Sequence, residues 1–186
     1  MPKTKLSLRT IGMFLLLLGL AAAPALAGYI SAGDKLGDLA FPPPVNPDDA
    51  KLLGVPADQP FKLSQLGAPY ILIESFSTGC PHCYTHAPSM NKLYGLITKN
   101  PKTADKIKVL GLAASDSPNN LVGWKKQLKV PFALVPDPDQ ATTKKLNIMG
   151  TPTTIFMNKN GDVLLAKAGA FENAEEFLKE LIGLMK

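Results

Sequence analysis

The sequence predicts an α/β domain with three layers, in which helices cover a mixed central sheet on both faces. Three observations lead to this fold class. Short apolar runs alternate with amphipathic segments through the middle of the chain, as strands alternate with helices. An Asn160-Gly161 pair then separates two further apolar runs, and this dipeptide favours the tight turn of a β-hairpin. The last segment has the apolar spacing of an amphipathic helix.

Residues 1–27 are predicted to be a secretory signal peptide that is cut before Gly28. Basic residues precede an apolar run from Ile11 to Leu20, and Ala25-Leu26-Ala27 provides the small residues of a cleavage site. The apolar run is short for a membrane span. We therefore expect export to the periplasm, with an uncleaved signal that tethers the domain to the membrane as the alternative.

The charge of the mature chain argues against nucleic-acid binding. The full chain has 20 basic and 15 acidic residues. Loss of Lys3, Lys5 and Arg9 with the signal peptide leaves 17 basic residues against 15 acidic ones, a net charge near +2. The remaining lysines are scattered and no arginine is left. The 159 residues that follow the signal peptide suit a single domain.

Residues 28–60 are predicted to form an extended N-terminal arm that wraps over the core. The arm contains Phe41-Pro42-Pro43-Pro44 and Asn46-Pro47-Asp48-Asp49. Prolines at this density disfavour a helix or a central strand, so we expect at most one short hairpin around Lys51 to Val55. The globular domain is predicted to span residues 61–186.

The elements of that domain follow in order. Apolar runs predict strands that are buried on both faces, at Tyr70–Phe76, Lys106–Ala113 and Phe132–Val135. Helical segments are expected after each strand: one that begins near Cys80, one over residues 119–128 with a Ser117 or Asn119 cap, and one over residues 140–146 with an Asp139 cap. The hairpin joins Met149–Met157 to Asp162–Ala166, and the final helix spans about Asn173 to Met185.

The only two cysteines of the chain lie where the first strand gives way to the first helix, in Cys80-Pro81-His82-Cys83. Unpaired N–H groups and the helix dipole favour negative charge at such a point, so Cys80 should ionise more easily than a free thiol. A thiolate attacks disulfides, and Cys83 is close enough in sequence to resolve a mixed disulfide. The spacing therefore predicts thiol-disulfide exchange.

Two other interpretations of this stretch stay open. A structural disulfide would close a loop of only four residues, which stabilises by roughly 2 kcal/mol on the chain-entropy model. A metal site could use Cys80, His82, Cys83 and His86, but a structural zinc site normally takes a second pair of ligands elsewhere, and the sequence contains no other cysteine or histidine.

The order of elements, the C-x-x-C at the first strand-helix junction and Thr151-Pro152 before the closing hairpin resemble the thioredoxin fold, over roughly Phe61 to Lys186. The spacing between Cys83 and Pro152 resembles TlpA/ResA-like redoxins (AhpC/TSA-like). The active-site tetrapeptide, with Glu74 upstream, is instead similar to that of DsbA. The resemblance implies an α/β thioredoxin-like domain in which a TlpA/ResA-like scaffold carries a DsbA-like active-site tetrapeptide.

The resemblance also implies roles for individual residues. Cys80 would be the attacking sulfur, Cys83 the resolving one, and His82 would stabilise the Cys80 thiolate. Glu74 would be a buried proton acceptor for Cys83. Pro152 would be the cis-proline that faces the dithiol, and Thr151 would offer backbone groups to an extended substrate segment. His86 is expected at the surface or in the cleft, with a proton-handling role as the alternative.

These observations predict an exported thiol-disulfide oxidoreductase that acts on cysteine-containing proteins without a bound cofactor or metal. The scaffold indicates a TlpA/ResA-like reductase, for example in cytochrome c maturation, whereas the tetrapeptide indicates a DsbA-like oxidase. A membrane or periplasmic redox partner would recycle the site, and we expect a monomer. The alternatives are a copper-binding redoxin-family metallochaperone, which would use the two cysteines and one histidine, and a peroxiredoxin-like peroxidase.

Overall fold

The computed structural model describes Met1 and residues 29–186, so the predicted signal peptide lies outside the described residues. A five-stranded mixed sheet has the order β5-β4-β3-β6-β7. Its strands are β3 (Tyr70–Phe76), β4 (Ile107–Ala114), β5 (Ala133–Asp137), β6 (Thr153–Asn158) and β7 (Val163–Ala168). β3, β4 and β5 are parallel, whereas β6 runs antiparallel to both β3 and β7. The alternation of strands and helices predicted from the sequence is confirmed.

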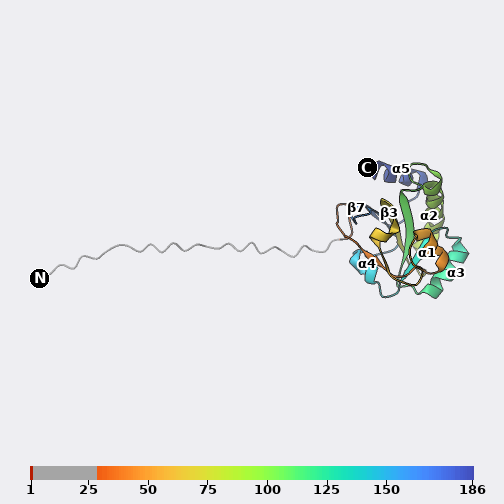
Figure 1. Ribbon diagram of the computed structural model, residues 1–186, viewed down its shortest axis with the longest axis horizontal. Helices are drawn as coiled ribbons and strands as arrows, with labels where there is room; N and C mark the ends of the chain where they lie inside the picture. Colours follow the sequence, from red (N-terminus) through yellow and green to blue (C-terminus); the bar gives the residue numbers. More distant parts are fainter. Residues whose placement is uncertain (2–28) are drawn as a thin grey trace.

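Helices cover the sheet on both faces, so the predicted three-layer architecture is also confirmed. One face carries α2 (Pro81–Lys99), α3 (Pro118–Leu128) and α5 (Ala174–Leu184), which pack on side chains such as Leu72 and Phe156. The other face carries the N-terminal segment and the residues after α4 (Ala141–Lys145), which pack on Ile73 and Ile155. Figure 1 shows the sheet with α4 on its left and α2 and α3 on its right.

A helix forms in the segment that was predicted to be extended, and this corrects the prediction for residues 28–60. Helix α1 (Pro47–Leu53) replaces the expected hairpin. The Asn46 side chain accepts a hydrogen bond of 2.9 Å from the Asp49 N–H, and Pro47 occupies the first helical position, where the missing N–H costs no hydrogen bond. Gly54 ends the helix in a left-handed conformation. Pro47 therefore starts a helix instead of preventing one.

The rest of the N-terminal segment wraps over the core, as expected. Two short strands, β1 (Ala40–Phe41) and β2 (Phe61–Lys62), pair with each other and lead into the 3-10 helix η1 (Leu63–Leu66). The rings of Phe41 and Phe61 stack with their centroids 5.3 Å apart, and both side chains are buried. The N-terminal segment therefore contributes to the same apolar core as the sheet.

The cap of α4 differs from the prediction. Asp137, at the end of β5, accepts hydrogen bonds from the Thr142 N–H (3.2 Å) and the Thr143 N–H (2.7 Å), whereas Asp139 was expected in this role. Asp137 is buried and its carboxylate is directed at the first turn of the helix.

Within residues 29–186, no helix has both the length and the apolar character needed to cross a membrane.

Candidate active site

The two cysteines lie where β3 gives way to α2. Cys80 is the N-cap residue of α2, Pro81 follows at the first helical position, and Cys83 lies in the first turn. Cys80 is partly exposed, whereas Cys83 is buried, with 2% of its surface accessible. Both are free thiols in this structure. The site therefore presents one accessible sulfur and one protected sulfur.

The loop before β6 faces this dithiol. The peptide bond between Thr151 and Pro152 is cis. The carbonyl oxygen of Thr151 lies 3.3 Å from the Sγ atom of Cys80. On the other side of the loop, the Gly169 N–H donates a 2.8 Å hydrogen bond to the Pro152 carbonyl. The fold thus brings Cys80, Thr151 and Pro152 together, and the residue that follows β7 supports the loop that carries the proline.

The two thiols differ in acidity. Partial burial acts to raise the pKa of Cys80, but hydrogen bonds from the Thr151 side chain, from Cys83 and from the His82 backbone outweigh it, so the pKa of Cys80 is lowered. Burial raises the pKa of Cys83 to about 12. Cys80 is therefore the more reactive nucleophile near neutral pH, and Cys83 keeps its proton until a base removes it.

The backbone of His82 contributes to the acidity of Cys80. Its N–H group is among the donors that lower the pKa of Cys80. The side chain is exposed, and within residues 29–186 the imidazole has no hydrogen bond to Cys80. Stabilisation of the thiolate by the imidazole stays a prediction.

Glu74 and His86 form a buried pair below the dithiol. The Oε1 atom of Glu74 lies 2.9 Å from the Nδ1 atom of His86, and its Oε2 atom accepts a 2.8 Å hydrogen bond from the Thr154 hydroxyl. The expectation that His86 lies at the surface or in the cleft is wrong, because only 2% of the residue is accessible. His86 lies one turn after Cys83 on the inner side of α2, where the ring of Phe171 packs edge-on against it at 4.5 Å.

A small cavity connects Glu74 with the buried sulfur. Both Glu74 and Cys83 line it, and its volume of about 20 Å³ suffices for one water molecule. Its other walls are apolar: Phe76, Ala87, Met90, Trp124, Val130 and Phe132. Gly111 of β4 pairs with Glu74 in the sheet, and a methyl group there would lie 2.7 Å from Leu134 and 2.9 Å from Phe76. The predicted proton acceptor and Cys83 thus line one small cavity.

Asp116 holds the loop that precedes Cys80, and it was not among the site residues predicted from the sequence. Its carboxylate accepts hydrogen bonds from the Thr78 N–H (2.8 Å), from the Thr78 hydroxyl and from the Asn120 amide (3.2 Å). Asp116 is buried, with 4% of its surface accessible. Its position just after β4 was a usable signal, because the carboxyl ends of the parallel strands β3 and β4 lie at the same edge of the sheet.

Comparison with known proteins places this geometry in a family. Residues 46–166 match the AhpC/TSA family, which is well over half of the chain. The chain belongs to the AhpC/TSA family. It is similar to the thiol:disulfide interchange protein DsbE of Escherichia coli K12, with 26% identity over 87% of this chain and 86% of DsbE. It is also similar to the thiol-disulfide oxidoreductase ResA of Bacillus thuringiensis, with 25% identity over 60% of this chain and 62% of ResA.

Solved structures support the thioredoxin-like fold of this AhpC/TSA family member. A crystal structure of a DsbE-like interchange protein from Chlorobium tepidum aligns with a TM-score of 0.62 and 22% identity, covering 82% of this chain and 96% of the other. A solution structure from Bacteroides thetaiotaomicron, described as a protein disulfide isomerase, aligns with a TM-score of 0.65 and 19% identity, covering 85% and 92%. The relatives and the fold together identify the protein as a thioredoxin-like thiol-disulfide oxidoreductase.

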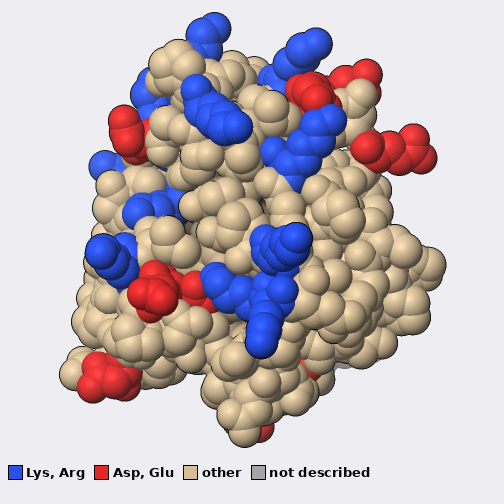
Figure 2. Space-filling model, turned by 90° about the vertical axis from the view of Figure 1, so that its right-hand side faces the viewer, with Lys and Arg blue, Asp and Glu red and all other residues tan. Residues whose placement is uncertain are grey.

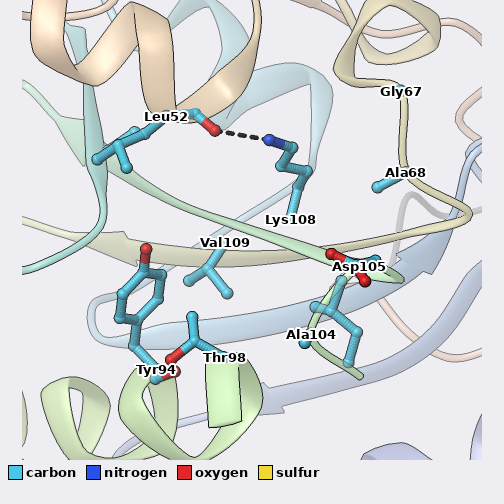
Figure 3. Close-up of a pocket in the computed structure, with 11 residues that line it drawn as sticks. Leu52, Gly67, Ala68, Tyr94, Thr98, Ala104, Asp105, Lys108 and Val109 are labelled. Atoms are coloured by element: carbon cyan, nitrogen blue, oxygen red, sulfur yellow. Dashed lines mark hydrogen bonds between the residues drawn. The ribbon is translucent and has the colours of Figure 1, made fainter. Parts of the chain in front are cut away.

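A larger hollow lies away from the dithiol of this family member. It has a volume of about 210 Å³ and lies near Ile107, where β4 begins, at the opposite end of the sheet from Cys80. Figure 3 shows Tyr94 and Thr98 of α2 on one side and the Lys108 side chain on the other, with the Lys108 Nζ atom 2.6 Å from the Leu52 carbonyl oxygen. Burial raises the pKa of Tyr94. This hollow has no contact with the reacting sulfurs.

The charged side chains of this family member give no continuous patch on the face that carries α2 and α3. Figure 2 shows the lysines of this face in several groups, separated by uncharged surface and acidic side chains. Lys92 of α2, for example, forms an ion pair of 2.7 Å with Glu175 of α5. Within residues 29–186, no three His, Cys, Asp or Glu side chains come together as a metal site would need.

Proposed function

We propose that this AhpC/TSA family member is an exported enzyme that exchanges disulfides with cysteine-containing proteins through Cys80 and Cys83. The observation that carries the proposal is the difference between the two sulfurs. Cys80 is accessible and has a lowered pKa, whereas burial raises the pKa of Cys83 to about 12. Such a pair suits an attacking thiolate and a resolving thiol.

The reaction needs only the atoms of the two proteins. The Cys80 thiolate attacks one sulfur of a substrate disulfide, which forms a mixed disulfide and releases the first substrate thiolate. Cys83 then loses its proton and attacks Cys80. The Cys80–Cys83 disulfide forms, the mixed disulfide breaks, and the second substrate thiolate leaves. Two electrons pass to the substrate, and the reverse sequence would oxidise a dithiol substrate.

We propose the reductive direction, as in a TlpA/ResA-like reductase that serves cytochrome c maturation. The oxidase interpretation rests on stabilisation of the Cys80 thiolate by the His82 imidazole, and the exposed His82 ring does not support it. The similarity to DsbE and ResA supports the reductive interpretation. A membrane or periplasmic redox partner would return electrons to the disulfide.

Equilibration of the mature protein with glutathione buffers tests the direction. We expect the Cys80–Cys83 disulfide to persist in buffers that reduce a DsbA-like oxidant, because a reductase requires a low reduction potential. A high potential together with an acidic Cys80 would overturn the reductive direction. Peroxide consumption catalysed by Cys80 alone would instead favour the peroxidase alternative. Fractionation of cells that express the full chain tests export, and the mature protein should appear outside the cytoplasm.

A further inference from the structure

The two ring nitrogens of His86 have different hydrogen-bond partners. The backbone N–H of Phe171 lies 3.3 Å from Nε2 and donates to it, so Nε2 must carry a lone pair. The proton of the neutral ring is then on Nδ1, 2.9 Å from the Oε1 atom of Glu74. His86 is thus a neutral imidazole that donates a hydrogen bond to the carboxylate.

This donor acts on a carboxylate that has little access to water. Glu74 is 5% exposed. Its second oxygen already accepts a hydrogen bond from the hydroxyl of Thr154, a fully buried residue. A buried carboxylate keeps its charge only when hydrogen bonds replace the lost hydration. His86 and Thr154 fix one oxygen each and thereby orient the whole group.

The oriented carboxylate lines the same cavity as the thiol that has to lose a proton. Glu74 and Cys83 line the same cavity of about 20 Å³, which is large enough for one water molecule to carry a proton between them. Cys83 must be a thiolate before it can attack Cys80 in the mixed disulfide. The burial that protects Cys83 also makes it hold its proton strongly, so the resolving step depends on a base nearby.

We propose that His86 is a positioning residue for the resolving step, because its Nδ1–H holds the Glu74 carboxylate in place at the cavity that Glu74 shares with Cys83. In that step the Cys83 proton moves to Glu74, and the Cys83 thiolate forms the bond to Cys80 as the substrate sulfur leaves. In the reverse reaction the protonated Glu74 returns the proton to Cys83. This inference rests on the proposed function and assigns His86 a role that neither cysteine chemistry nor the cis-proline loop explains.

His86 also has a structural contact, and the experiment must separate the two roles. An asparagine amide nitrogen takes approximately the place of Nδ1 and can still donate to Glu74. A glutamine amide oxygen takes approximately the place of Nε2 and can still accept from the Phe171 N–H. His86→Asn and His86→Gln are therefore matched variants, since both lose the ring contact with Phe171 and each keeps one of the two hydrogen bonds.

The test uses an aromatic disulfide whose thiolate is coloured, 5,5′-dithiobis(2-nitrobenzoate), with the reduced mature protein. Attack by Cys80 releases the first coloured thiolate, and attack by Cys83 on the mixed disulfide releases the second. We expect the first phase to be alike in all proteins. The second phase should be about tenfold slower or more in His86→Gln, as loss of a hydrogen bond to a charged group implies, and close to wild type in His86→Asn.

Control variants keep the outcome interpretable. In a Glu74→Gln background, His86→Gln should slow the second phase no further, because its effect acts through the carboxylate. Thermal unfolding of both His86 variants monitors folding, and Thr154→Val removes the other donor to Glu74 without a change at His86. Equal slowing in His86→Asn and His86→Gln, or additive slowing in the Glu74→Gln background, would overturn the positioning role. A wild-type protein that releases a single coloured thiolate would instead overturn the proposed function itself.

Discussion

The Sγ atom of Cys80 lies 3.3 Å from the carbonyl oxygen of Thr151, although 71 positions separate the two residues in the chain. The reacting sulfur therefore lies against a backbone group of the loop before β6. A substrate segment attached to Cys80 would lie beside this backbone, where strand addition could orient it. The same loop supplies the Thr151 side chain that helps to lower the pKa of Cys80.

Alkylation with iodoacetamide as a function of pH should distinguish the two thiols. The pKa of Cys80 is lowered from 9.0. The alkylation rate of Cys80 should therefore reach half of its maximum at a lower pH than the rate of a free thiol does. Cys83 should stay unmodified until the pH approaches 12. Thr151→Val should raise the Cys80 midpoint, whereas Thr153→Val should not, because the Thr153 hydroxyl donates to the Gly150 carbonyl instead. Preferential labelling of Cys83 at neutral pH would contradict this assignment.

Asp116→Asn should destabilise the fold and loosen the loop before Cys80. The asparagine cannot accept all three hydrogen bonds from Thr78 and Asn120, and a buried donor left unpaired costs about 1–3 kcal/mol. Urea unfolding measures the loss. Asp105→Asn is the control, because Asp105 is exposed and a surface change of this kind stays within about 0.5 kcal/mol. Equal effects of the two substitutions would refute the role of Asp116.

Lys125→Met should destabilise the protein by about 3–5 kcal/mol, since it leaves a buried charge without its partner. Asp49 of α1 is fully buried, pairs with Lys125 and accepts a 3.1 Å hydrogen bond from the Leu134 N–H. The double variant Asp49→Asn with Lys125→Met should lose less than Lys125→Met alone. Lys126→Met, on the exposed neighbour, serves as the control. If all three unfold at the same urea concentration, the ion pair does not anchor α1.

Gly161→Ala should cost more stability than Gly169→Ala, although both glycines have a φ of 82°. The left-handed conformation alone costs about 1–2 kcal/mol for alanine. At Gly161 the added methyl group would also lie 2.2 Å from the Gly37 carbonyl oxygen, whereas at Gly169 it meets no atom of residues 29–186 within 4 Å. Overpacking should add about 1–3 kcal/mol at Gly161. Thermal unfolding compares the two, and a larger loss at Gly169 would contradict the close contact.

Local patterns predicted the order of strands and helices because each element carries its own periodicity. The hairpin around Asn160-Gly161 is the clearest case, since its turn residues and flanking apolar runs agree. The prediction was wrong at α1, where the prolines of residues 42–47 were counted as helix breakers. The Asn46-Pro47-Asp48-Asp49 sequence contains a cap, an N1 proline and acidic residues in the first turn, which together favour a helix start.

The interactions that sequence analysis missed join distant parts of the chain. His86 is buried because Phe171, 85 positions away, covers its ring and donates to Nε2. Asp116 binds Thr78 across 38 positions. No local periodicity encodes such contacts, whereas the cysteines were found because their spacing is itself the chemical signal.

The missing side chain at Gly111 influences how far the charge of Glu74 acts. With no Cβ at this position, the rings of Phe76 and Phe132 and the Leu134 side chain close over the strand beside the carboxylate. Hydrocarbon walls have a low dielectric constant, and the field of a charge weakens far less across them than across water. The absence of a methyl group at Gly111 therefore lets apolar side chains surround Glu74 and Cys83. Movement of a single proton there strongly changes the electrostatic potential at both groups.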